Sequence, residues 1–279
     1  MLRGLYTAWT GMVNEQNRMD ILTNNLANVS TVGYKKEGST SQAFDDVLTV
    51  KIKDASVGLS NVQRTGIRNP GVKIGENYVD FSGGSFRETG NIYDLALDGD
   101  GFFAIEFAYK NSQGNNVNNN STANNNNANT QRTTMYTRAG QFTLTRDGYL
   151  VNQDGDYVLD VQNRRIQLNT LVDSVITTDG TISQNGRAVA QIQVADFEDY
   201  DYLEKYGETY FRPLEGARLR NGGGTATVNS GYLEMANVQA VSEMVNLIAI
   251  TRAYEANQKI IQTYDDSLQI AVTQLGRLS

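Results

Sequence analysis

The last forty residues of the chain carry a continuous helical repeat. Neither Gly nor Pro interrupts it before Gly276, and nine of its ten positions are apolar or aromatic. Its positions, at alternating steps of three and four, are Leu247, Ile250, Tyr254, Asn257, Ile261, Tyr264, Leu268, Ala271, Leu275 and Leu278. This spacing is the a/d seam of a coiled coil, which a helix buries only against another helix. The pattern predicts a long helix that packs either on its own domain or within an assembly.

The N-terminal residues repeat the same pattern. Leu5, Ala8, Met12, Glu15, Met19, Leu22, Leu26 and Val29 share the spacing, and only Glu15 is charged. Two such segments pair most simply with each other or with copies of themselves. We therefore predict a helix over 1–35 paired with a helix over 236–279. The expected assembly interface is Leu5, Met12, Met19, Leu22, Leu26, Leu247, Ile250, Tyr254, Asn257, Ile261, Tyr264, Leu268 and Leu275.

Between the helices the sequence favours β-structure, so the expected class is α+β. Residues 36–94 and 222–235 should form an extended β connector with one helical turn over Phe44–Leu48, and residues 95–221 a β-rich central domain. The dipeptides Asp147-Gly148 and Asp154-Gly155 are typical of hairpin turns. Within 111–131, 11 of 21 residues are Asn. Because such a tract cannot bury enough apolar area to offset its ordering, we expect a mobile surface loop.

The composition excludes many functions. The chain has no Cys and no His, which removes disulfides, thiolate nucleophiles, imidazole catalysis and the usual zinc sites. Its net charge is −7 and its 24 Lys and Arg are scattered, so nucleic-acid binding is not expected. The sequence contains no run of ~18 apolar residues, so no membrane-spanning helix is expected. The carboxylate pairs Asp45/Asp46 and Asp265/Asp266 are expected to be solvated, and Asp98–Gly101 to be a turn rather than a calcium loop. We expect no catalytic residue, metal or cofactor.

Short motifs at both ends resemble one family. The segment Asn24-Asn25-Leu26-Ala27-Asn28, followed by a Ser/Thr turn and then Gly33-Tyr34-Lys35, resembles the N-terminal signature of bacterial flagellar rod and hook proteins. The segments Gly231–Val238 and Arg252–Asn257 resemble the second signature of that family, and Tyr136–Gly140 resembles part of its central domain. Val32 departs from the pattern, where many members carry a proline or a small polar residue. On the residues alone, the Asn cluster is also explained as the cap that ends a helix.

The resemblance implies a non-enzymatic function. It points to a structural axial subunit of the flagellar basal-body rod, of the distal type, whose terminal helices form a coiled-coil layer around an export channel. The implied partners are copies of itself, other rod and hook subunits and the type III export apparatus, which would carry it across the cytoplasmic membrane without a cleaved signal peptide. A proximal rod or hook-type subunit is the alternative, and a secreted peptidoglycan hydrolase a distant one. We expect the terminal helices to be largely disordered in the free monomer and to order on assembly.

Overall fold

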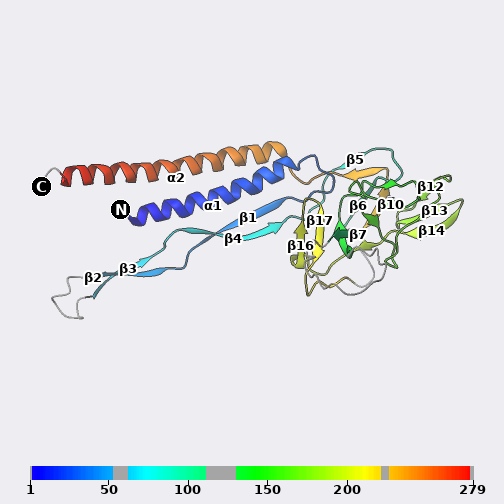
Figure 1. Ribbon diagram of the computed structural model, residues 1–279, viewed down its shortest axis with the longest axis horizontal. Helices are drawn as coiled ribbons and strands as arrows, with labels where there is room; N and C mark the ends of the chain where they lie inside the picture. Colours follow the sequence, from blue (N-terminus) through cyan, green and yellow to red (C-terminus); the bar gives the residue numbers. More distant parts are fainter. Residues whose placement is uncertain (1, 53–61, 111–129, 221–225, 277–279) are drawn as a thin grey trace, which may run out of the picture. The chain divides into compact units, whose positions relative to one another are not determined.

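The computed structural model describes residues 2–52, 62–110, 130–220 and 226–276. It has one helix near each end of the chain and a β-rich region between them, which confirms the α+β class (Figure 1). The chain divides into two compact units. The helical unit contains Met1–Ala27, Lys36–Asp80 and Val238–Ser279, and the β unit contains Asn28–Lys35 and Phe81–Asn237. The Asn-rich tract lies outside the described residues, except for its last two positions.

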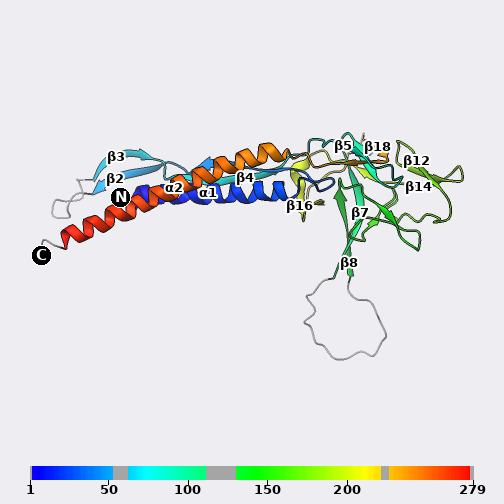
Figure 2. The same ribbon diagram turned by 90° about the horizontal axis from the view of Figure 1, so that it is seen from above.

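Two helices lie side by side in the helical unit. Helix α1 spans Leu2–Ala27 and helix α2 spans Ala240–Leu275 (Figures 1 and 2). They are antiparallel, because Gly4 of α1 faces Tyr264 of α2 while Gly11 faces Asn257. A Cβ at Gly4 would lie 2.2 Å from the Tyr264 hydroxyl oxygen, and one at Gly11 would lie 3.1 Å from Asn257 Nδ2. The two glycines therefore allow a close approach of the helices.

Two antiparallel strand pairs complete the helical unit. Strand β1 (Glu37–Ala43) pairs with β4 (Val72–Val79), and β2 (Val47–Ile52) pairs with β3 (Val62–Arg68). The helical turn expected over Phe44–Leu48 is wrong, because Val47 already begins β2. Apolar and polar residues alternate from Leu48 to Ile52, which is the period of a β-strand. The strand pairs with β3 along its whole length.

Helix α1 packs on the β1–β4 pair through polar side chains. Asn25 is fully buried, and its amide exchanges two hydrogen bonds with the backbone of Glu37: Nδ2 donates to the carbonyl at 2.8 Å, and Oδ1 accepts from the N–H at 2.9 Å. Eleven residues earlier, about three helical turns, Asn14 Nδ2 donates to Ser41 Oγ at 3.0 Å. The Asn side chains thus attach the first strand to the helix by satisfying buried polar groups.

The β unit is built on one large antiparallel sheet. Its strand order is β16-β17-β8-β7-β11-β10-β9, and β15 also pairs with β7. The strands are β7 (Phe102–Lys110), β8 (Thr130–Thr137), β9 (Thr143–Leu144), β10 (Leu150–Val151), β11 (Tyr157–Val158), β15 (Val194–Ala195), β16 (Leu203–Tyr206) and β17 (Tyr210–Pro213). A single 3₁₀ turn, η1 (Tyr200–Tyr202), is described before β16.

Smaller sheets extend this unit. Strands β12 (Ser174–Ile176), β13 (Thr181–Gln184) and β14 (Arg187–Gln191) form a meander. Two further pairs join segments that are distant in sequence: β5 (Phe86–Glu88) with β19 (Tyr232–Glu234), and β6 (Leu95–Asp98) with β18 (Thr227–Ser230). These pairs tie the segment that enters the unit to the segment that leaves it.

The core of the β unit is apolar and aromatic. Its main cluster consists of Leu95, Leu97, Phe103, Phe142, Leu150, Val158, Ile166, Leu168, Ile182, Ile192 and Val228. A second, aromatic cluster lies around Phe102, whose ring is 5.7 Å from that of Phe81 and 5.4 Å from that of Phe211. Neighbouring residues of β7 enter different clusters because side chains alternate between the faces of a strand.

The contact between α1 and β1 gives a first prediction. Replacing Asn25→Ala should lower the free energy of unfolding by about 1–3 kcal/mol, because the N–H and carbonyl of Glu37 lose their partner in a buried setting. Hydrogen exchange at the Glu37 amide should accelerate accordingly, while urea denaturation reports the stability. Gln16→Ala, at an exposed position of the same helix, is the matched control. Equal stability of the two variants would contradict this role for Asn25.

Candidate assembly site

The predicted interface residues of α2 share one face of the helix. Ile250 is buried, and Leu247, Tyr254, Asn257, Ile261, Tyr264 and Leu268 are half-buried. From Arg252 onward, every other described side chain of α2 is exposed except that of Ala271. Leu275 lies in the last turn, and its side chain is outside the described part. The stripe thus faces α1 at the positions where Tyr264 and Asn257 contact its glycines.

The predicted residues of α1 are only partly covered. Leu5, Met12, Met19, Leu22 and Leu26 are all half-buried. The most buried positions of this helix, Ala8, Thr10, Asn14, Ile21 and Asn25, are mostly polar. Helix α1 therefore has two packed faces, one toward α2 and one toward the β1–β4 pair.

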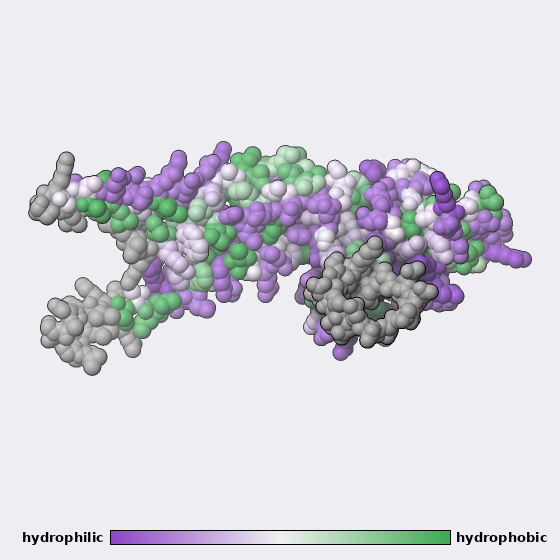
Figure 3. Space-filling view, viewed as in Figure 1, coloured by the Kyte–Doolittle hydropathy of each residue, from purple (hydrophilic) through white to green (hydrophobic). Residues whose placement is uncertain are grey.

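A further apolar face of α2 has no cover within the described part of the chain. Val241, Val245 and Ile248 are 76%, 61% and 53% exposed. Figure 3 shows apolar residues gathered over the first half of α2. On α1, Tyr6 and Trp9 are also exposed, with their ring centroids 5.8 Å apart. Exposed apolar patches of this kind mark contact surfaces.

The signature residues after α1 lie in the β unit and make close contacts there. Gly33 has φ of +70°, and its N–H donates to the carbonyl of Glu234 at 2.8 Å. A Cβ at this position would lie 2.3 Å from the backbone nitrogen of Ala139. The next residue, Tyr34, is buried, with the Lys205 ammonium 3.9 Å above its ring centre. Gly33 is thus required by both its conformation and its surroundings.

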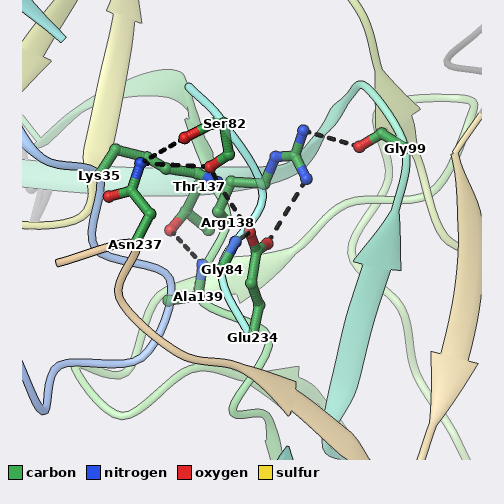
Figure 4. A network of polar contacts seen from close by, with 9 residues as sticks. All are labelled: Lys35, Ser82, Gly84, Gly99, Thr137, Arg138, Ala139, Glu234 and Asn237. Atoms are coloured by element: carbon green, nitrogen blue, oxygen red, sulfur yellow. Dashed lines mark hydrogen bonds and ion pairs between the residues drawn. The ribbon is translucent and has the colours of Figure 1, made fainter. Parts of the chain in front are cut away.

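Lys35 joins a buried ion cluster, here named the Glu234 cluster: Lys35, Arg138 and Glu234. Lys35 Nζ lies 2.7 Å from Glu234 Oε1, and each side chain is only 1% exposed. On the other side of the carboxylate, Arg138 Nη1 lies 3.5 Å from Glu234 Oε2 (Figure 4). The backbone N–H of Gly84 also donates to Oε1, at 3.0 Å.

Backbone carbonyls accept further hydrogen bonds from the two cations, although the buried Nε of Arg138 has no hydrogen-bond partner among the described residues. Lys35 Nζ donates to the carbonyl of Ser82 at 2.7 Å, and Arg138 Nη2 donates to that of Gly99 at 2.9 Å (Figure 4). The Arg138 guanidinium also lies 5.2 Å from the ring centre of Phe102. A buried ion pair is tolerated only with such extra hydrogen bonds, because both charges have left water.

The sequence alone did not identify Arg138 and Glu234 as site residues. Each is the only charged residue in a motif of mostly apolar or small residues. That isolated charge was the one signal in the sequence that could have indicated a buried ion pair. A second pair of this kind lies in the helical unit, where Lys36 contacts the buried carboxylate of Glu243 near the start of α2. The two lysines that follow Tyr34 thus each reach a Glu of the C-terminal segment.

No catalytic arrangement is present among the described residues. The pairs Asp45/Asp46 and Asp265/Asp266 are exposed, and no group of three or more acidic side chains in the described part is placed to hold a metal ion. Asp98–Gly101 is a turn between β6 and β7, in which Gly99 and Gly101 have φ of +112° and +148°. None of the described helices is both long and apolar enough to cross a membrane.

Comparisons with known proteins identify the family. Three family models match the chain: "Flagella basal body rod protein" over residues 5–35, "Flagellar hook protein FlgE/F/G D1 domain" over 126–187, and "Flagellar basal body rod FlgEFG protein C-terminal" over 229–275. The flagellar basal-body rod protein FlgG of Bacillus subtilis (strain 168) is 33% identical over 286 residues, which cover 96% of this chain and 97% of that protein. The chain belongs to the flagellar basal-body rod protein family.

Other members align just as completely. FlgG of Caulobacter vibrioides is 32% identical, covering 98% of this chain and 99% of the relative. The flagellar hook-basal body complex protein FlhO of Bacillus subtilis is 29% identical over the full length of both chains. The family consists of structural proteins of the rod and hook, so this member is not an enzyme.

The three matched segments meet at the Glu234 cluster. Lys35 is the last residue of the first match, Arg138 lies in the second and Glu234 in the third. The family signature around Gly33–Lys35 is therefore explained by packing within one chain.

The Glu234 cluster gives a second prediction. Glu234→Gln should lower the free energy of unfolding by about 3–5 kcal/mol, because it leaves two buried cations without a counter-charge. The same change at Glu204, whose carboxylate pairs with Arg212 at the surface, should cost less than about 1 kcal/mol. Chemical denaturation followed by far-UV circular dichroism measures both. Similar losses of unfolding free energy in the two variants would show that the Glu234 cluster does not stabilise the fold through its buried charges.

Gly33 gives a third prediction, with a control that separates two causes. Gly207 has nearly the same φ, +68°, but nothing within 4 Å of a Cβ placed there. Gly207→Ala should therefore cost only the backbone strain, about 1 kcal/mol. Gly33→Ala adds the collision with Ala139 and should cost about 3 kcal/mol or more. Thermal unfolding of both variants tests this; equal shifts in Tm would contradict the close approach.

Proposed function

We propose that this protein is a structural subunit of the flagellar basal-body rod, of the distal type. The observation that carries the proposal is the match with FlgG proteins over 96% and 98% of this chain. A hook subunit is less favoured, because hook proteins usually carry larger central domains. A proximal rod subunit stays the alternative. Nothing in the comparisons supports the peptidoglycan hydrolase.

The helical unit is the part proposed to polymerise. Its helix pair covers the seam only partly, and Val241, Val245 and Ile248 stay open. Contact with neighbouring copies removes this apolar area from water, at roughly 25 cal/mol per Å². We infer that α1 and α2 of successive copies form a coiled-coil layer around an export channel. The copies stack through heterologous contacts, which do not close into a small ring.

The remaining partners follow from the same proposal. Other rod and hook subunits join the two ends of the stack, and the subunit reaches its place through the flagellar export apparatus without a cleaved signal peptide. The apolar faces of the two helices are only partly covered within one chain. Such helices are suited to become fully ordered when they contact neighbouring copies at the growing end.

A charge placed in the seam tests this role. Ile261→Asp should abolish incorporation into rods in a flagellated strain that lacks its own copy, because a carboxylate on this half-buried face costs about 2 kcal/mol or more at every contact. Gln262→Asp, at an exposed neighbouring position, is the matched control and should assemble normally. Near-UV circular dichroism should report an unchanged β unit in both. Normal rods built from Ile261→Asp would remove the seam from the mechanism.

A further inference from the structure

The β unit carries a cleft lined by three arginines. The cleft has a volume of about 480 Å³. Its wall includes Glu106, Arg132, Tyr149, Arg164, Arg165 and Gln167, and we name it the arginine cleft. A concentration of arginines is unexpected on a chain with 31 acidic and 24 basic residues.

One arginine of the cleft is engaged within the chain. Arg165 forms two hydrogen bonds with Glu106, at 2.6 and 3.0 Å, and its guanidinium lies 4.0 Å from the ring centre of Tyr157. The hydrogen bond from Arg165 lowers the pKa of Glu106, so this carboxylate stays ionised. Arg165 therefore forms a fixed floor rather than a binding group.

The other two arginines are open to solvent. Arg132 Nε lies 3.2 Å from Glu106, and Arg164 Nη2 lies 3.5 Å from Asp160, but their side chains are 63% and 69% exposed. Three cations thus share two carboxylates, which leaves one positive charge at the rim. Guanidinium groups in such a position suit bidentate contacts with carboxylates.

A rigid turn presents Arg164. The Asp160 N–H donates to the carbonyl of Arg164 at 2.8 Å, and the Asn163 N–H donates to the carbonyl of Asp160 at 2.7 Å. The carboxylate of Asp160 accepts the N–H of Gln191 at 3.2 Å, which ties the turn to β14. A pre-formed turn loses little conformational freedom on binding.

The same unit carries a group of opposite charge, here named the acidic turn: Glu198, Asp199 and Asp201. All three side chains are exposed, and none forms an ion pair among the described residues. The turn is also rigid, because the Asp199 carboxylate accepts the N–H of Asp201 at 3.0 Å and so caps η1. Tyr200 anchors it, since its hydroxyl donates to Asp196 at 2.8 Å.

We propose that the acidic turn of one copy binds in the arginine cleft of a neighbouring copy. This rests on the proposed function, because a stack that grows by heterologous contacts needs two different, complementary surfaces on each copy. The charges match, and the two surfaces share no residue. Pairs of this kind contribute mainly to register and to the choice of partner. The apolar faces of the helices supply most of the affinity.

Charge exchange in the full chain tests the contact. Arg132→Glu/Arg164→Glu should raise the critical concentration for polymerisation about tenfold, because like charges then face each other. Glu198→Arg/Asp201→Arg should do the same, and the chain with all four changes should return close to the original value. Arg87→Glu/Arg187→Glu, at exposed sites elsewhere on the β unit, is the matched control.

The absence of cysteine allows a direct second test. A chain with Gln162→Cys and Tyr202→Cys, at exposed positions beside the two surfaces, should give a ladder of disulfide-linked oligomers when its polymer is oxidised, whereas one with Val189→Cys and Tyr202→Cys should not. Unchanged polymerisation of the Arg132→Glu/Arg164→Glu variant, without a ladder, would overturn this contact alone and leave the cleft to another anionic partner, such as a polysaccharide. Wild-type chains that never polymerise would overturn the proposed function as well.

Discussion

The carboxylate of Glu234 joins three segments of the β unit that are distant in sequence, and the packing of these segments depends on it. It is buried and ionic, so it is stable only while Lys35 and Arg138 are both present. All three residues belong to the β unit, where Lys35 comes from the segment after α1, Arg138 follows β8 and Glu234 ends β19. Since each alone would be a buried unpaired charge, the cluster favours one arrangement of three distant segments over others that bury the same apolar area.

The two units differ in how much of their apolar surface is buried within a single chain. The β unit has a fully enclosed core, in which Phe102, Phe103 and Phe142 have no exposed surface, and its exposed apolar side chains, such as Leu171 and Val175, lie outside that core. The helical unit leaves a continuous apolar face of α2 exposed, at Val241, Val245 and Ile248. An exposed apolar face promotes aggregation of a monomer, whereas in a polymer it is buried against neighbouring copies. The β unit is therefore suited to fold within one chain, and the helical unit to gain its final stability from neighbours.

Periodic features were predictable from the sequence, and contacts between distant residues were not. The seam spacing indicated the burial pattern of α2, and the Asp-Gly dipeptides marked turns in which Gly148 and Gly155 have φ of +80° and +90°. These signals are local. The pairing of β5 with β19 depends on strands of three residues, too short to show alternation. Lys35 and Glu234 are 199 positions apart, and a charged residue in a sequence is normally expected at the surface.

The glycines of α1 explain how a long apolar seam acquires one register. Gly4 faces Tyr264 and Gly11 faces Asn257, so the two contacts are seven residues apart on both helices. Shifting α1 by one turn would bring Ala8 to the place of Gly4, where a Cβ comes within 2.2 Å of the tyrosine oxygen. A polar Asn at a seam position adds to this restriction at some cost in stability. Apolar side chains alone would tolerate several registers, each with the exposed faces of α1 and α2 in a different relation. A stack of identical copies requires a single relation, and the pairing of small with large residues provides it.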